Sequence, residues 1–168
     1  DLKSEISTQL DAAVEYNSEH LSLNLAGYYN NFSNFIFYRK LSAVAGGDST
    51  VDVGGESLTA FKFSQRAAHL VGIETTVDIH PHPLDSLHIQ NTFSLVSGKL
   101  KEKIEGSDDL PFIPAPKLLT ELRADFKNTG IYFKNSYVKF EIENTFKQSH
   151  PFTAYNTETA TPAYTLLN

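Results

Sequence analysis

The feature of this sequence that most constrains its fold is a two-residue alternation of apolar and polar side chains along much of the chain. Successive side chains of a β-strand point to opposite faces of a sheet, so this period predicts strands with one apolar and one polar face. In the clearest stretch, 71–79, Val, Ile and Thr at odd positions alternate with Gly, Glu, Thr and Asp at even positions. Because aromatic and β-branched residues are also frequent, we assign the chain to the all-β class.

The alternation predicts about seven strands of about ten residues each. We expect them in 8–16, 21–38, 58–80, 87–95, 118–127, 138–147 and 163–168. Short connections, at 17–19, 80–83 and 128–136, alternate with long ones, at 42–56, 98–116 and 149–162. Short turns at one end and long loops at the other are typical of a transmembrane β-barrel. We therefore expect an antiparallel up-and-down meander, with lipid on its apolar face and a hydrated lumen on its polar face.

Composition excludes several classes of protein. The chain has 20 acidic and 14 basic residues and a net charge of −6, so it lacks the basic surface of a nucleic-acid-binding protein. It has no Cys, which excludes disulfides, thiolate metal sites and thiol nucleophiles. No stretch approaches the ~18 apolar residues of a membrane-spanning helix. Because there is no Met, and no signal segment follows Asp1, we expect an internal fragment or a processed product.

Sequence motifs of enzymes are absent as well. There is no Gly-x-Ser-x-Gly elbow, Gly-x-Gly-x-x-Gly loop or Gly-Lys-Ser/Thr loop. Glu74 and Asp78 share the polar face of one predicted strand, and paired carboxylates serve acid/base catalysis in some enzymes. Carboxylates that line a hydrated lumen are the interpretation that fits a barrel. We predict no enzymatic activity, no catalytic residue and no cofactor.

Four segments resemble the barrel of TonB-dependent outer-membrane receptors, in the same order. They are 23–36, a Tyr-, Phe- and Asn-rich strand; 65–74, with Gly-Ile-Glu; 110–118, with Leu-Pro-x-Ile-Pro; and 156–168, with Thr-Pro-x-Tyr. The resemblance covers nearly the whole chain. It implies that residues 1–168 are about seven strands from the C-terminal part of a 22-stranded transmembrane β-barrel, without the plug and the closing strands.

The same resemblance implies a location and a function. The location is the outer membrane of a Gram-negative bacterium, in contact with lipid or lipopolysaccharide. The function is uptake of a scarce small-molecule ligand, most commonly a ferric siderophore or other iron chelate, energised by the TonB complex through the N-terminal part of the receptor. TonB-dependent receptors transport their ligands and do not transform them chemically.

An alternative explanation of the alternation is a soluble β-sandwich or small barrel that binds a ligand or a carbohydrate. The two hypotheses predict different burial of the apolar side chains. Val71, Ile73, Val77 and Phe140 face outward in a membrane barrel, whereas in a sandwich they pack into a shared core.

The predicted hairpin of 118–127 and 138–147 allows a prediction of ion pairs. If its centre lies near Tyr132, Arg123 lies opposite Glu141 and Asp125 lies opposite Lys139. Directly opposed side chains of antiparallel strands interact, and all four are on the charged face. We therefore predict two lumen-facing ion pairs.

Two further groups of residues are candidates for binding. His80 and His82 flank a proline, but a pair of imidazoles without further ligands is more typical of a solvated turn, so we predict no metal site there. Arg66, His69 and Tyr155 are candidates for contact with an anionic ligand from the outer side. The alternative for these three residues is a place in a solvated loop.

Overall fold

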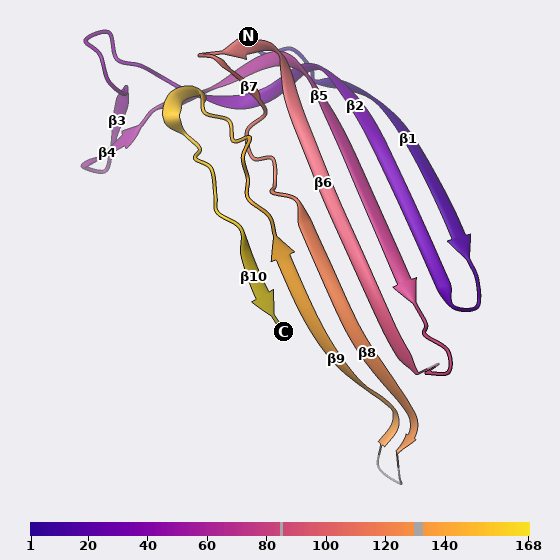
Figure 1. Ribbon diagram of the computed structural model, residues 1–168. Coiled ribbons are helices and arrows are strands. Elements are labelled where there is room, and N and C mark those ends of the chain that lie inside the picture. The colour runs from indigo at the N-terminus through magenta and orange to yellow at the C-terminus, as the bar shows by residue number, and fades with distance from the viewer. Residues whose placement is uncertain (85, 130–132) are drawn as a thin grey trace.

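The computed structural model, which describes residues 1–84, 86–129 and 133–168, is built around one antiparallel sheet. Its consecutive neighbours are β1 (Ile6–Asn17), β2 (Leu21–Lys40), β5 (Phe61–Ile79), β6 (Leu87–Ile104), β8 (Lys117–Thr129), β9 (Phe133–Thr145) and β10 (Tyr164–Leu167). β7 (Ser107–Asp109) pairs with β6, β3 (Thr50–Val53) pairs with β4 (Glu56–Thr59), and η1 (Ala154–Asn156) is a 3₁₀ turn. In the described part of the chain, no helix is long and apolar enough to cross a membrane. The predicted all-β up-and-down meander is confirmed (Figure 1).

The connections differ in length at the two ends of the sheet. The connections from β1 to β2 and from β5 to β6 lie at one end, the short-connection end, at the bottom of Figure 1. Segments 41–60, 105–116 and 146–163 join strands at the opposite end, the long-connection end. These connections alternate in length as predicted, whereas residues 130–132 of the predicted short connection 128–136 lie outside the described residues.

The strand register separates apolar from polar side chains over the whole width of the sheet. Leu25 pairs with Thr75, Thr75 with Phe93, and Phe93 with Leu118, so the apolar positions of successive strands share one face. We call this the apolar face and the opposite one the polar face. Exposed side chains on the apolar face are Leu10, Val14, Leu25, Val71, Ile73, Leu95, Leu122, Val138 and Phe140.

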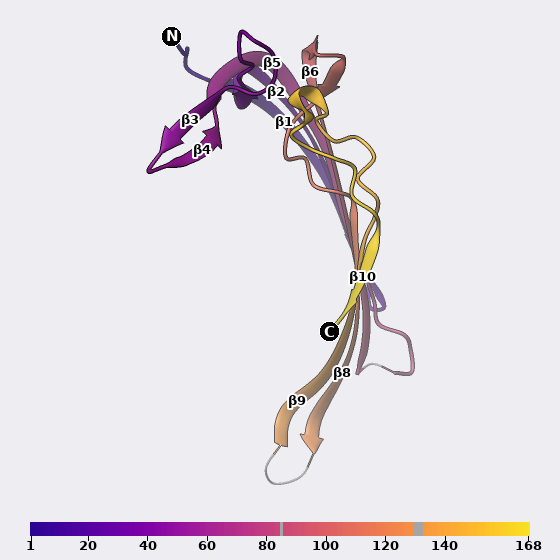
Figure 2. The ribbon, with the colours of Figure 1, turned by 90° about the vertical axis from the view of Figure 1, so that its left-hand side faces the viewer.

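The exposure of the apolar face decides between membrane barrel and sandwich. Val71 is 46% exposed, Ile73 41% and Phe140 43%, and Val77 is half-buried. Seen from its edge, the sheet is a single curved layer, and within the described residues no second sheet packs on it (Figure 2). The shared core that the sandwich alternative requires is not present, so that alternative is wrong.

A small hydrophobic core lies on the polar face near the long-connection end. It is formed by Phe37, Ala68, Leu100, Leu110, Phe152 and Ala154, each at most 4% exposed. A β-bulge between Phe32 and Phe35, with Asn34 in the left-handed region at φ 63°, adds one residue to β2. Because the period of a strand is two, this extra residue turns Phe37 to the face on which Phe32 lies.

The same core explains why one predicted loop begins too early. We predict a connection from residue 98, but β6 continues to Ile104. A Cβ at Gly98 would lie 2.8 Å from side-chain atoms of Leu70, Leu110 and Ile113. The returning segment packs directly on the strand at this point, and this packing holds the charged stretch after residue 98 in the sheet.

Candidate functional site on the polar face

Most charged side chains of the sheet lie on the polar face, because they occupy the alternate positions of the amphipathic strands; Lys99, which pairs with His69, is an exception near the long-connection end. Toward the short-connection end and along β8 and β9 it carries Glu74, Asp78, His88, Glu121, Arg123, Asp125, Lys139, Glu141 and Glu143. Three parts of this face carry groups that could bind a ligand: the ion pairs of β8 and β9, a histidine cluster and the long-connection end.

The ion pairs between β8 and β9 differ from those predicted. Arg123 lies opposite Lys139 and Glu121 opposite Glu141, so the predicted pairs Arg123–Glu141 and Asp125–Lys139 are wrong. The register differs by two residues, and a shift of two keeps every side chain on its predicted face. The predicted hairpin centre, Tyr132, lies outside the described residues.

The observed register sets like charges opposite one another, and neighbouring groups of opposite sign compensate for this. Lys139 Nζ lies 3.2 Å from a carboxylate oxygen of Glu121 and 2.6 Å from one of Glu141. Arg123 donates to Asp125 Oδ1 at 2.9 Å and stacks over the Tyr137 ring, with its guanidinium carbon 4.4 Å from the ring centroid. Each cation thus has a carboxylate that the facing strand or its own strand supplies.

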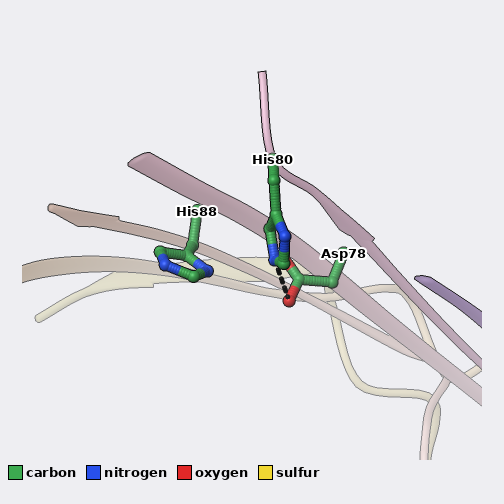
Figure 3. Close-up of side chains that lie close together, drawn as sticks. All are labelled: Asp78, His80 and His88. Atoms are coloured by element: carbon green, nitrogen blue, oxygen red, sulfur yellow. Dashed lines mark hydrogen bonds and ion pairs between the residues drawn. The ribbon is translucent and has the colours of Figure 1, made fainter. Parts of the chain in front are cut away.

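A histidine cluster lies at the short-connection end, where β5 ends and β6 begins. His80 Nε2 is 3.1 Å from Asp78 Oδ2, and the rings of His80 and His88 are 4.5 Å apart between centroids (Figure 3). His88 Nε2 lies 3.1 Å from Asp125 Oδ2 on the neighbouring strand β8. The ring of His82 instead lies 5.6 Å from that of His20.

Sequence reasoning missed this cluster because it considered the neighbours His80 and His82. A usable signal was present: positions 78, 80 and 88 are all even, and the hairpin of β5 and β6 places even positions of both strands on the polar face. Ile79 pairs with Ile89 at the end of this ladder, and His80 and His88 are the next residues in the same antiparallel register.

Two pockets of more than 500 Å³ lie at the long-connection end. One, of about 520 Å³, lies between the ends of β2 and β5 and the returning loops, and is lined by Tyr38, Lys40, Asp48, Thr59, Phe61, Pro111, Phe112, Phe152, Asn156, Thr157 and Glu158. The second, of about 580 Å³, is lined by Asp1, Leu2, Arg39, Lys62, Phe63, Ser64 and Gln65. Arg39 and Lys62 are direct partners in the ladder, and among the described residues neither forms an ion pair. Two facing cations repel, so this second pocket favours an anion.

The structure separates the three predicted ligand-contact residues. Arg66 pairs with Phe35 and lies on the polar face, where its Nε is 4.0 Å from a carboxylate oxygen of Glu102. Tyr155 packs edge-on against Phe152, and burial raises the pKa of its phenol above the usual value. His69 is on the opposite face of β5, where it stacks on Tyr29 with ring centroids 6.1 Å apart. Arg66 and Tyr155 therefore share one face, and His69 does not.

Comparison with known proteins identified a matching family model and similar solved structures. The family model described as TonB dependent receptor-like, beta-barrel, matches residues 1–168. Among solved structures, a chain titled "Copper transporter OprC" superposes with a TM-score of 0.74 at 15% sequence identity, covering 99% of this chain. The chain spans 23% of the length of that structure. No curated protein sequence matches it.

Proposed function

Because this chain belongs to the TonB-dependent receptor-like β-barrel family, we propose that it forms one sector of the barrel of an outer-membrane transporter. Barrels of this family lie in the outer membrane of Gram-negative bacteria. The transporter takes up a small ligand with energy from the TonB complex, which contacts the receptor through its N-terminal part. TonB-dependent receptors are transporters, so the family agrees with the prediction of no enzymatic activity.

The observation that carries this proposal is the exposed apolar face. Leu10, Val14 and Val138 are each more than 60% exposed, although they belong to a regular sheet with a charged opposite face. An exposed apolar surface of this extent needs a covering partner. Outer-membrane lipid or lipopolysaccharide supplies that partner, and a hydrated lumen accommodates the charges of the polar face.

The edges of the sheet support a place within a larger barrel. In the described part of the chain, β1 pairs along one edge with β2 alone, and β10 with β9 alone. Unpaired backbone groups are costly in lipid, and closure removes them. We propose that further strands of the parent protein continue the sheet at both edges to complete a 22-stranded barrel, which a separate plug fills.

The cationic pocket at the long-connection end supports an anionic ligand. Arg39 and Lys62 face each other there, and Arg66 lies four residues along β5 from Lys62, on the same face. A bound anion relieves the repulsion between the facing cations and gains charge-assisted hydrogen bonds. Anionic ferric siderophores and other iron chelates fit this requirement, and we propose an iron chelate as the transported ligand.

Uptake by cells that express the full-length receptor tests the proposal. Labelled ferric siderophores are compared with copper, vitamin B12 and oligosaccharides, in strains with and without TonB. We expect TonB-dependent accumulation of a ferric chelate. Accumulation that is independent of TonB contradicts the energised mechanism. TonB-dependent accumulation of another cargo alone contradicts the proposal that the transported ligand is an iron chelate.

A matched pair of variants tests the binding pocket. Combining Arg39→Gln with Lys62→Gln should weaken binding of the anionic chelate by roughly tenfold or more, because each lost charge-assisted bond is worth about 1.5–3 kcal/mol. Lys101→Gln removes one positive charge from β6 outside this pocket and should leave binding unchanged. Equal weakening by both changes would indicate a general charge effect instead of a site.

A further inference from the structure

We propose that Asp78, His80 and His88 form a binding site for a divalent transition-metal ion on the polar face, at the short-connection end. The ligand atoms of the three side chains all lie within 4.8 Å of one another. They come from the end of β5, the residue that follows it and the start of β6 (Figure 3). The site is at the opposite end of the sheet from the cationic pocket and does not depend on which ligand is transported.

The backbone holds these residues in a regular arrangement. Asp78 pairs with Gln90 and with Ser22 in the two ladders of β5. The amide of His80 donates to the carbonyl of His20 at 2.9 Å, which extends the hydrogen bonding between β2 and β5 beyond the last strand residue. Ligands that are held by strands keep their geometry better than ligands on loops. The cluster is therefore preorganised for binding an ion.

The donor set selects the class of metal. Two imidazole nitrogens and one carboxylate oxygen suit Zn²⁺, Cu²⁺, Ni²⁺ or Co²⁺, whereas Ca²⁺ and Mg²⁺ prefer oxygen ligands alone. Metal–ligand bonds of about 2.0–2.2 Å place neighbouring ligand atoms about 3.3 Å apart around a tetrahedral ion. Binding an ion therefore requires the three ligand atoms, which lie within 4.8 Å of one another, to move closer together. A fourth position remains for water.

Two features around the cluster support a cation there. Asp78 Oδ1 is buried and, among the described residues, has no hydrogen-bond partner. A buried carboxylate oxygen without a partner is unfavourable, and a bound cation supplies the missing interaction. In addition, Asp125 holds His88 at 3.1 Å and is itself held by Arg123 at 2.9 Å. A carboxylate that accepts a hydrogen bond from one ring nitrogen orients the other nitrogen of a metal-binding histidine.

Calorimetric titration of the full-length receptor with Zn²⁺, after chelator treatment, tests the site. We expect His80→Ala and His88→Ala each to remove one Zn²⁺ site per receptor. Asp125→Asn should weaken binding at that site by roughly 10- to 100-fold, as for other residues that orient a ligand. The matched control is His82→Ala, two residues from His80 and outside the cluster. It should leave the stoichiometry unchanged.

A spectroscopic measurement separates loss of ligands from loss of folding. Co²⁺ bound by imidazole and carboxylate groups absorbs in the visible range, and His80→Gln should lose this band while the receptor still migrates as a folded barrel on a gel. Equal Zn²⁺ stoichiometry in the wild type, His80→Ala and His88→Ala overturns the proposal. Loss of a site in His82→Ala as well also overturns it. Neither result affects the proposed uptake of an iron chelate.

Discussion

Tyr28 lies directly opposite Gly72 in the ladder between β2 and β5, and its ring covers the glycine on the polar face. A Cβ added at Gly72 would overlap the Tyr28 ring. Gly72 is buried although it has no side chain, because the aromatic ring shields its backbone. An aromatic residue opposite a glycine is a recognised way to stabilise a strand that a glycine weakens.

This relationship predicts non-additive mutations. Gly72→Ala should destabilise the wild-type barrel by about 1 kcal/mol, because the new methyl group displaces the ring. In the Tyr28→Ala background the same change should be neutral or stabilising, because alanine is better than glycine in a strand. Unfolding of the full-length receptor in liposomes measures all four proteins, and additive effects would contradict the predicted coupling.

Charge substitutions on neighbouring residues test the assignment of the two faces. Ile73→Arg places a charge on the apolar face and should cost about 2–4 kcal/mol if this face contacts the bilayer interior. Glu74→Arg, one residue later on the polar face, should change stability by less than about 0.5 kcal/mol. The free energy of unfolding in liposomes measures both. Equal costs would mean that lipid does not contact the apolar face.

Disulfide trapping tests the register of β8 and β9. Opposed residues of antiparallel strands have Cα atoms about 4.5–5.5 Å apart, which suits a disulfide. Arg123→Cys combined with Lys139→Cys introduces two opposed thiols that should form a disulfide readily. Because this chain has no Cys, none of its own thiols competes with them. Arg123→Cys with Glu141→Cys is the control and should oxidise slowly. Faster oxidation of the control, followed by gel mobility, would restore the register predicted from sequence.

The core on the polar face makes a separate prediction. Phe152 is 1% exposed and packs edge-on against Phe37. Phe152→Ala should therefore lower the free energy of local unfolding by about 3–5 kcal/mol. The control is Phe112→Ala, because Phe112 is 76% exposed. Limited proteolysis should cleave segment 146–163 faster in the first variant and at the wild-type rate in the second. Equal rates in both variants would show that Phe152 does not anchor the segment.

The phenol of Tyr155 predicts a dependence on pH. Burial favours its neutral form and raises its pKa above the ordinary value of 10.0. The stability that the buried neutral phenol gives to the fold is therefore complete below about pH 10, and it is lost as the pH rises through the raised pKa. Hydrogen exchange of segment 146–163 should increase above that pH in the wild type. Tyr155→Phe should show a smaller increase, and an identical increase in both would contradict the role of this phenol.

Local sequence determined that the chain forms strands and, outside the β-bulge of β2 and the end of β6, which face a side chain takes. The alternation in 71–79 is sufficient to identify β5 and to place Ile73 and Glu74 on opposite faces, because both properties depend on the chain within a few residues. The same alternation and the turn residues between strands predicted the order of short and long connections. The resemblance of four segments to TonB-dependent receptors identified the family.

The tertiary structure alone decided which residues of different strands meet. A shift of two residues between β8 and β9 leaves the apolar and polar faces unchanged, so alternation cannot distinguish Arg123–Lys139 from Arg123–Glu141. The end of β6 likewise depends on Leu110 and Ile113, which pack over Gly98 from a distant part of the fold. The cluster of Asp78, His80 and His88 arises in the same way. A period of two fixes the direction of a side chain, whereas its neighbours depend on the pairing of the strands.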